Sequence, residues 1–173
     1  LMQLEVPLDT VIRAAQVAHA RGVKVVLNPA PAQELPADLL SLVDVFVPNE
    51  SETALLTKMP VANRSEMEAA AMALSETGVA TVVLTLGARG AMLAEPGGTE
   101  LLPAFAVTPV DTTAAGDAFM GGFGVALAEG QSLRKAVRWG NAAGALATTR
   151  VGAQPSLPTR QGLEQLLSER STR

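Results

Sequence analysis

The segment from Asp111 to Asp117, Asp-Thr-Thr-Ala-Ala-Gly-Asp, combines small residues and two carboxylates directly before an apolar helical pattern. Small side chains suit a backbone that must approach a ligand closely. The free N–H groups at the start of a helix, together with the helix dipole, form a ready-made anion site. Asp117 is poorly placed to bind an anion itself but well placed to take a proton from an attacking hydroxyl. The segment therefore suggests phosphoryl transfer, in which positioning and charge stabilisation carry most of the catalysis.

A structural explanation of the same segment is a capped helix whose small residues serve packing. A carboxylate in the first turn, such as that of Asp117, also complements the helix dipole. This explanation does not say why three small residues, Ala114, Ala115 and Gly116, directly precede the carboxylate. Both interpretations stay open at this point.

Asn49 and Glu52 lie three residues apart at a predicted helix start, just after a predicted strand. The common explanation is a cap with an acidic first turn. The functional explanation is that Glu52 organises Mg²⁺ and its waters near a phosphate chain, while Asn49 contacts the nucleotide. One carboxylate is sufficient for that, because Mg²⁺ keeps several waters and needs few protein ligands.

The turn from Thr85 to Gly90, Thr-Leu-Gly-Ala-Arg-Gly, follows a buried-type strand. Neither a G-x-x-x-x-G-K-[ST] phosphate loop nor a G-x-G-x-x-G motif occurs in the chain. The turn is a weak nucleotide signal, and Gly87 and Gly90 fit a tight connection between strands equally well.

The segment 149–156 supplies carbonyls and a hydroxyl in irregular backbone after a helix. Such oxygens suit a monovalent or hard cation. Taken without context, the segment fits a plain loop after a helix end.

The composition excludes several classes of function. The chain has 173 residues, enough for one domain with a real core. Aromatic residues make up 3% and the net charge is −4, so we expect no nucleic-acid partner. The absence of Cys excludes disulfides, zinc–thiolate sites and thiol catalysis. No apolar run is long enough to span a bilayer, and we expect a cytoplasmic protein with no membrane partner.

Hydrophobic periodicity and turn residues predict the elements that position these groups. Helices are predicted over 9–21, with Asp9 as cap, and over 36–42, 49–57, 64–77, 115–129, 132–149 and 159–170. Strands are predicted over 23–27, 43–47 and 81–85, with a hairpin over 91–94 and 99–104. The early alternation of strands and helices predicts an α/β fold, a doubly wound and mostly parallel sheet with helices on both faces. In such sheets, ligands bind at the carboxyl ends of the strands.

Taken together, these motifs resemble the ribokinase family of sugar kinases, also called the PfkB carbohydrate kinase family. The segment 111–117 looks like its C-terminal signature, although the family more often has Gly where Ala114 stands. Asn49-Glu50-Ser51-Glu52 looks like the family's N-x-x-E motif. The runs 28–31, Asn-Pro-Ala-Pro, and 152–156, Gly-Ala-Gln-Pro-Ser, look specifically like ribokinases. The order and spacing of the motifs match over nearly the whole chain.

The resemblance implies ATP-dependent phosphorylation of D-ribose. Asp117 would be the base for the primary hydroxyl, beside an anion hole formed by Ala114, Ala115 and Gly116. ATP would be contacted by Asn49, Thr85, Leu86, Gly87, Ala88, Arg89, Gly90, Gly116 and Asn141. Glu52 would serve Mg²⁺, and Glu5 would bind the sugar. An activating K⁺ would bind at Asp111, Thr113, Ala147, Arg150, Gly152 and Ser156.

The chain departs from the family in one large respect. The family's long N-terminal half, which holds most sugar contacts and a β-sheet lid used in dimerisation, has no counterpart here. We therefore expect residues before Leu1 to be missing, the ribokinase-like fold to be incomplete, and the full-length protein to be a homodimer. Two alternatives stay open. The acceptor could be a nucleoside, pseudouridine or a ketose, or the chain could be a truncated, non-catalytic nucleotide-binding fragment.

Overall fold

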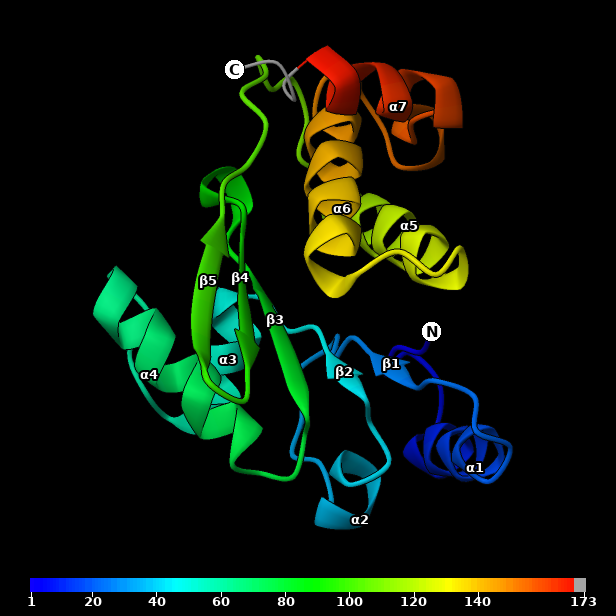
Figure 1. Ribbon diagram of the computed structural model, residues 1–173, viewed down its shortest axis with the longest axis vertical. Helices are drawn as coiled ribbons and strands as arrows, with labels where there is room; N and C mark the ends of the chain where they lie inside the picture. Colours follow the sequence, from blue (N-terminus) through cyan, green and yellow to red (C-terminus); the bar gives the residue numbers. More distant parts are fainter. Residues whose placement is uncertain (170–173) are drawn as a thin grey trace. The chain divides into compact units, whose positions relative to one another are not determined.

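A computed structural model describes residues 1–169 and divides the chain into two compact units (Figure 1). The first unit consists of Leu1–Leu86 together with Met92–Leu101. The second consists of Gly87–Ala91 and the chain from Leu102 onward. Each unit has a hydrophobic cluster of its own. One domain over residues 1–173 stays a prediction.

The first unit alternates short strands with helices (Figure 1). Its helices are α1 (Leu8–His19), α2 (Ala37–Leu40), α3 (Glu50–Thr57) and α4 (Arg64–Ser75). Its strands are β1 (Val26–Leu27), β2 (Val45–Phe46), β3 (Thr81–Thr85), β4 (Ala91–Glu95) and β5 (Gly98–Leu102), of which the end residues Ala91 and Leu102 are assigned to the second unit. All the helices and strands predicted in this part of the chain are confirmed; β3 has the predicted ends and the others have shifted ends.

The five strands form one sheet in the order β1-β2-β3-β4-β5. β1 pairs with β2, and β2 with β3, in parallel, and Met2 adds a parallel bridge to Leu27 beside β1. The turn at Pro96-Gly97 joins β4 to β5 as the predicted hairpin (Figure 1). The predicted mostly parallel sheet with helices is therefore confirmed, and the carboxyl ends of β1, β2 and β3 meet at one edge.

β1 and β2 each have two residues, fewer than the five that the apolar runs predict. Just before β1, the N–H of Val25 donates to the Asp44 carboxylate at 2.6 Å and not to a neighbouring strand. Pro29 follows the end of β1 and Pro48 follows the end of β2, and proline has no N–H for the hydrogen-bond ladder. Local polar chemistry therefore shortens the ladders within apolar runs.

Apolar side chains, most of them aliphatic, form the core of the first unit. Burying one such side chain fully stabilises the fold by about 1.5–3 kcal/mol relative to leaving it exposed. Buried core members include Val11, Leu27, Leu39, Phe46 and Leu84.

The predicted cap of α1 is wrong, because Pro7 occupies the N-cap and Asp9 lies in the first turn. There the Asp9 carboxylate complements the helix dipole.

The second unit is mainly helical (Figure 1). It contains a 3₁₀ turn η1 (Gly87–Arg89), helices α5 (Ala115–Ala128) and α6 (Leu133–Ala147), a second 3₁₀ turn η2 (Gln154–Ser156), and α7 (Arg160–Glu169). The three predicted helices are confirmed, although position 170 of the last lies outside the described residues. No helix within residues 1–169 has the length and apolar character needed to cross a membrane.

α5 and α6 pack closely because small residues face each other between them. A Cβ on Gly122 would lie 2.8 Å from the Ala143 Cβ and 2.9 Å from the Trp139 carbonyl oxygen. Nearby on α5, the Phe119 and Phe123 rings stack with centroids 6.0 Å apart. The close approach of the two helix backbones therefore requires glycine at position 122.

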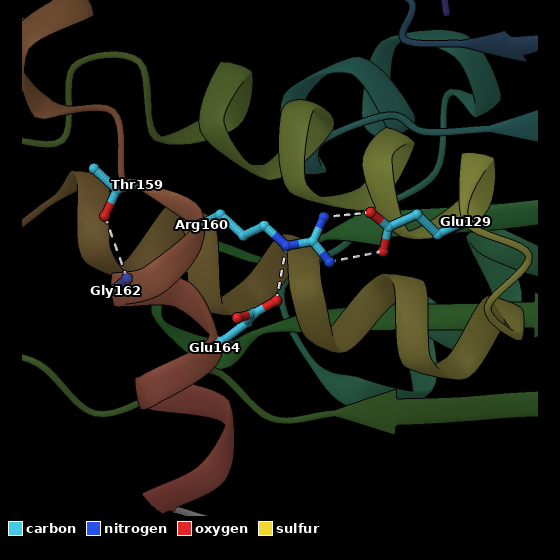
Figure 2. A network of polar contacts seen from close by, with 5 residues as sticks. All are labelled: Glu129, Thr159, Arg160, Gly162 and Glu164. Carbon is cyan, nitrogen blue, oxygen red and sulfur yellow. Dashed lines mark hydrogen bonds and ion pairs between the residues drawn. The ribbon is translucent and has the colours of Figure 1, made fainter.

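Arg160 ties α7 to the end of α5, as Figure 2 shows. Its guanidinium donates to both carboxylate oxygens of Glu129, and its Nε donates to Glu164 at 2.8 Å. The Cζ atom of the Arg160 guanidinium lies 5.5 Å from the centre of the Trp139 ring. The planar fork of arginine suits this arrangement, which joins α5, α6 and α7 through one side chain.

The contact between α5 and α6 predicts opposite effects of alanine at two neighbouring glycines. Gly122→Ala should destabilise the protein by about 1–3 kcal/mol, because the added methyl group meets the backbone of α6. Gly121→Ala is the matched control, since a Cβ there meets nothing within 4 Å. It should stabilise the helix by about 0.5–1 kcal/mol. Urea denaturation measures both effects, and equal effects of the two substitutions would contradict the packing described.

Candidate active site

Asn49 and Glu52 form a reciprocal cap at the start of α3. The Asn49 Oδ1 accepts the N–H of Glu52 at 2.9 Å. In return, the Glu52 carboxylate accepts the backbone N–H of Asn49 at 2.7 Å and its side-chain Nδ2 at 2.9 Å. The capping explanation of this motif is therefore observed, and any role in ligand binding has to be compatible with it.

Glu52 is a buried carboxylate, with 6% of its surface exposed. Burial raises the pKa of Glu52, and the hydrogen bond from the Asn49 N–H opposes that rise. Each carboxylate oxygen accepts one hydrogen bond from Asn49 and keeps further lone pairs. A cation reached through water would offset the cost of burying the charge, so Glu52 fits Mg²⁺. No cluster of three or more His, Asp or Glu within residues 1–169 could hold a metal.

Thr85 lies beside Asn49 at the carboxyl end of β3. The two residues form a parallel bridge, and the Thr85 N–H donates to the Pro48 carbonyl at 2.9 Å. Leu86 follows, and its side chain is buried in the core of the first unit. Of the predicted nucleotide residues, Asn49 and Thr85 therefore lie together with Glu52, whereas Leu86 has only its backbone to offer a ligand.

Gly90 and Asn141 meet at the backbone of residues 102–104 in the second unit. A Cβ on Gly90 would lie 2.1 Å from the Leu102 carbonyl oxygen, and its φ is +99°, so only glycine fits. The buried Asn141 donates its Nδ2 to the Leu102 carbonyl at 3.0 Å and to the Pro103 carbonyl at 3.3 Å. The tight connection that the sequence left open is observed. The exposed residues of the turn are Gly87, Ala88 and Arg89.

Ala114 precedes α5 with a left-handed backbone, at φ 58° and ψ 15°. This conformation is uncommon for a residue with a Cβ. The N–H of Ala115 donates to the Thr112 carbonyl at 3.2 Å. By contrast, the N–H of Gly116 has no hydrogen-bond partner within residues 1–169. Gly116 and Asp117 are both exposed, so a donor and a carboxylate stand accessible in one helix turn.

Asp111 joins two loops of the second unit. Its Oδ1 accepts the N–H of Thr113 at 2.9 Å, and its Oδ2 accepts the N–H of Gly152 at 2.8 Å. These hydrogen bonds, that from Gly152 most of all, lower the pKa of Asp111 to about 2. The Thr148 carbonyl adds a second link by accepting the N–H groups of Val110 and Asp111. Sequence reasoning missed Thr148, because a backbone carbonyl leaves no signature in residue type.

The remaining predicted cation residues lie along the segment that Asp111 anchors. The Ala147 carbonyl accepts the Arg150 N–H at 3.3 Å, and Gly152 has a positive φ of 93°. Ser156 is buried and donates its hydroxyl to the Ala153 carbonyl at 2.7 Å. Irregular carbonyls beside an ionised carboxylate are a donor set that fits a monovalent cation. Glu5, the predicted sugar ligand, is exposed in the first unit before α1.

The chain is similar to several sugar kinases. It is 50% identical over 161 residues to a ribokinase from Haemophilus influenzae, covering 93% of this chain and 53% of the relative. Its fold matches Arabidopsis thaliana ribokinase complexed with ribose and ATP, with a TM-score of 0.91 and 34% identity over 95% of this chain and 54% of that one. It also matches a fructokinase double mutant from Vibrio cholerae O395 with fructose, ADP and potassium bound. That match has a TM-score of 0.77 and 31% identity over 92% of this chain and 55% of that one.

The chain thus spans about half the length of the relatives that it matches. Residues 1–160 match the family described as pfkB family carbohydrate kinase. This match includes every segment from which the resemblance was inferred, from the run 28–31 to the loop ending at Ser156. The protein therefore belongs to the pfkB family of carbohydrate kinases.

Proposed function

We propose that the protein phosphorylates D-ribose with ATP, giving D-ribose 5-phosphate and ADP. The observation that carries the proposal is the exposed Asp117 carboxylate beside the Gly116 N–H at the start of α5, which has no hydrogen-bond partner within residues 1–169. A proton acceptor and an N–H that can donate a hydrogen bond to an anion, both in one helix turn, suit transfer of a phosphoryl group to a hydroxyl. The similarity to ribokinases from Haemophilus influenzae and Arabidopsis thaliana supports ribose as the acceptor.

In the proposed reaction, the Asp117 carboxylate accepts the proton of the primary hydroxyl of ribose. The hydroxyl oxygen attacks the γ-phosphorus of ATP, the bond from that phosphorus to the bridging oxygen breaks, and ADP leaves. The N–H of Gly116 stabilises the charge on the phosphoryl oxygens. Ala114 and Ala115 would complete the anion hole, although the N–H of Ala115 would first have to leave the Thr112 carbonyl.

We assign the nucleotide to the residues that the family resemblance indicates. These are Asn49, Thr85, Gly87, Ala88, Arg89, Gly90, Gly116 and Asn141. Bound Mg²⁺ would neutralise charge on the phosphates, and Glu52 would hold it through water. In return, the cation would relieve the cost of keeping the buried Glu52 carboxylate ionised.

We assign K⁺ to the loop that Asp111 anchors, with Thr113, Ala147, Arg150, Gly152 and Ser156 supplying further oxygens. Two observations support this proposal. The hydrogen bonds from Thr113 and Gly152 keep Asp111 ionised and fix both loops, and a related fructokinase contains bound potassium. Sugar binding by Glu5, a cytoplasmic location and a homodimer of the full-length protein stay predictions.

A second acceptor stays a candidate because the fructokinase relative binds fructose. A panel of D-ribose, ketoses, nucleosides and pseudouridine, tested with the full-length protein, separates these acceptors. For the 173-residue chain alone, the alternative to an active kinase is a fragment that binds nucleotide without catalysis. Calorimetry with ATP and Mg²⁺, together with a kinase assay on this chain, distinguishes the two, since binding without turnover supports the fragment.

The role of Asp117 predicts a large effect of a neutral isostere. In the full-length protein, Asp117→Asn should lower kcat with ribose by about 10²–10⁴-fold, because the amide cannot accept the proton. The KM for ATP should change much less. The matched control is Asp9→Asn, which also removes an exposed carboxylate from the first turn of a helix.

Both substitutions remove a favourable contact with a helix dipole, so both should lower Tm slightly. Only the substitution at position 117 should cause the large decrease in kcat. Retention of most of the turnover by Asp117→Asn would leave the helix-dipole explanation standing and refute the role as base.

The contacts of Asp111 predict a pH-dependent contribution to stability. Its pKa is about 2 in the folded chain against an ordinary value of 3.8, so it stabilises the fold above about pH 4. This contribution is lost as the pH falls from about 4 to 2. Thermal unfolding should therefore show a Tm gap between the unsubstituted protein and Asp111→Asn that is full at pH 5–6 and closes toward pH 2. A gap independent of pH would contradict the ionised contact.

A further inference from the structure

The hydrogen-bond ladder between β1 and β2 stops one step early. The N–H groups of Val45 and Val47 donate to the carbonyls of Val25 and Leu27, at 3.1 and 2.8 Å. In a parallel ladder with this register, the Val47 carbonyl would next accept the N–H of residue 29. That residue is Pro29, which has no N–H. The sequence therefore leaves the Val47 carbonyl without its ladder donor.

The Asn28 side chain supplies the missing donor. Its Nδ2 donates to the Val47 carbonyl at 2.8 Å. Its backbone N–H is already engaged with the Met2 carbonyl at 2.9 Å, so the backbone on which the side chain stands is fixed. Asn28 is half-buried, where an unmade hydrogen bond costs more than it would in water.

The carbonyl that Asn28 holds lies two residues before the cap of α3. Next along the chain, the Pro48 carbonyl accepts the N–H and, at 3.3 Å, the hydroxyl of Thr85. Asn49 then exchanges three hydrogen bonds with Glu52. The segment 47–49 is thus held by β3 on one side and by Asn28 on the other. Without the Asn28 side chain, the Val47 N–H would still bind the Leu27 carbonyl, but the Val47 carbonyl would lose the Nδ2 donor.

We propose that Asn28 is a positioning residue for the Asn49–Glu52 pair. By replacing the ladder donor that Pro29 lacks, it fixes the end of β2 and, through it, the two side chains assigned to the nucleotide and Mg²⁺. This inference rests on the proposed function for what the pair binds. The link from Asn28 to the pair rests on hydrogen bonds within the first unit alone.

The test measures ATP binding by calorimetry over a series of Mg²⁺ concentrations, with the full-length protein. Asn28→Ala should raise the Mg²⁺ concentration for half-saturation about tenfold, as loss of a residue that supports a metal ligand does. Adding Pro29→Ala to it should restore most of the affinity, since the new N–H at position 29 can donate to Val47 in ladder register. Asn63→Ala is the matched control, because Asn63 caps α4 and lies outside the pair. It should lower Tm and leave the Mg²⁺ dependence unchanged.

Two results would overturn the inference. One is an unchanged Mg²⁺ dependence in Asn28→Ala, or a change that Asn63→Ala reproduces, because either would mean a general effect on stability. The other is a double variant that binds no better than Asn28→Ala, because the Val47 carbonyl would then not be the link. Failure of the proposed function gives a different result, since the unsubstituted protein would then bind no Mg²⁺–ATP or would not phosphorylate ribose.

Discussion

The ends of strands and helices leave backbone N–H and C=O groups without partners, and the arrangement of this protein depends on the side chains that satisfy them. Asn49 and Glu52 satisfy the start of α3. Asp111 accepts two N–H groups from separate loops, and Asn28 reaches a carbonyl that a proline leaves unpaired. Short polar side chains directly after strands or before helices serve this purpose, and the residues assigned to ligands occupy the same places.

This coincidence gives some side chains two tasks. Glu52 is the clearest case, because its carboxylate makes the capping contacts while it is buried, and burial disfavours the charge. In a purely structural cap, an exposed glutamate would do as well. Asp111 shows the opposite balance, since the two N–H groups that it accepts favour its charged form. One carboxylate therefore gains from a cation nearby, while the other is already kept ionised by the backbone.

The sequence predicts what is local. The cap at Asn49 and Glu52, the start of α5 after Ala114 and the hairpin are encoded within a few residues, so their patterns were sufficient. It does not predict partners that are distant in the chain, such as Asp111 with Gly152 or Asn28 with Val47, because residue types do not specify register. The apolar runs predicted longer strands than β1 and β2 for the same reason, because residue types do not show which partners the backbone N–H and C=O groups have.

The left-handed Ala114 connects these observations. Such a conformation costs of order 1 kcal/mol or more and persists only where the surroundings hold it. The surroundings here are Asp111, fixed to Thr113 and Gly152, and the turn from the Ala115 N–H to Thr112. Glycine at position 114 would adopt the conformation without that support, at a larger entropic cost on folding. The alanine is therefore tolerated because the anchored loop on its N-terminal side already fixes the direction in which α5 begins.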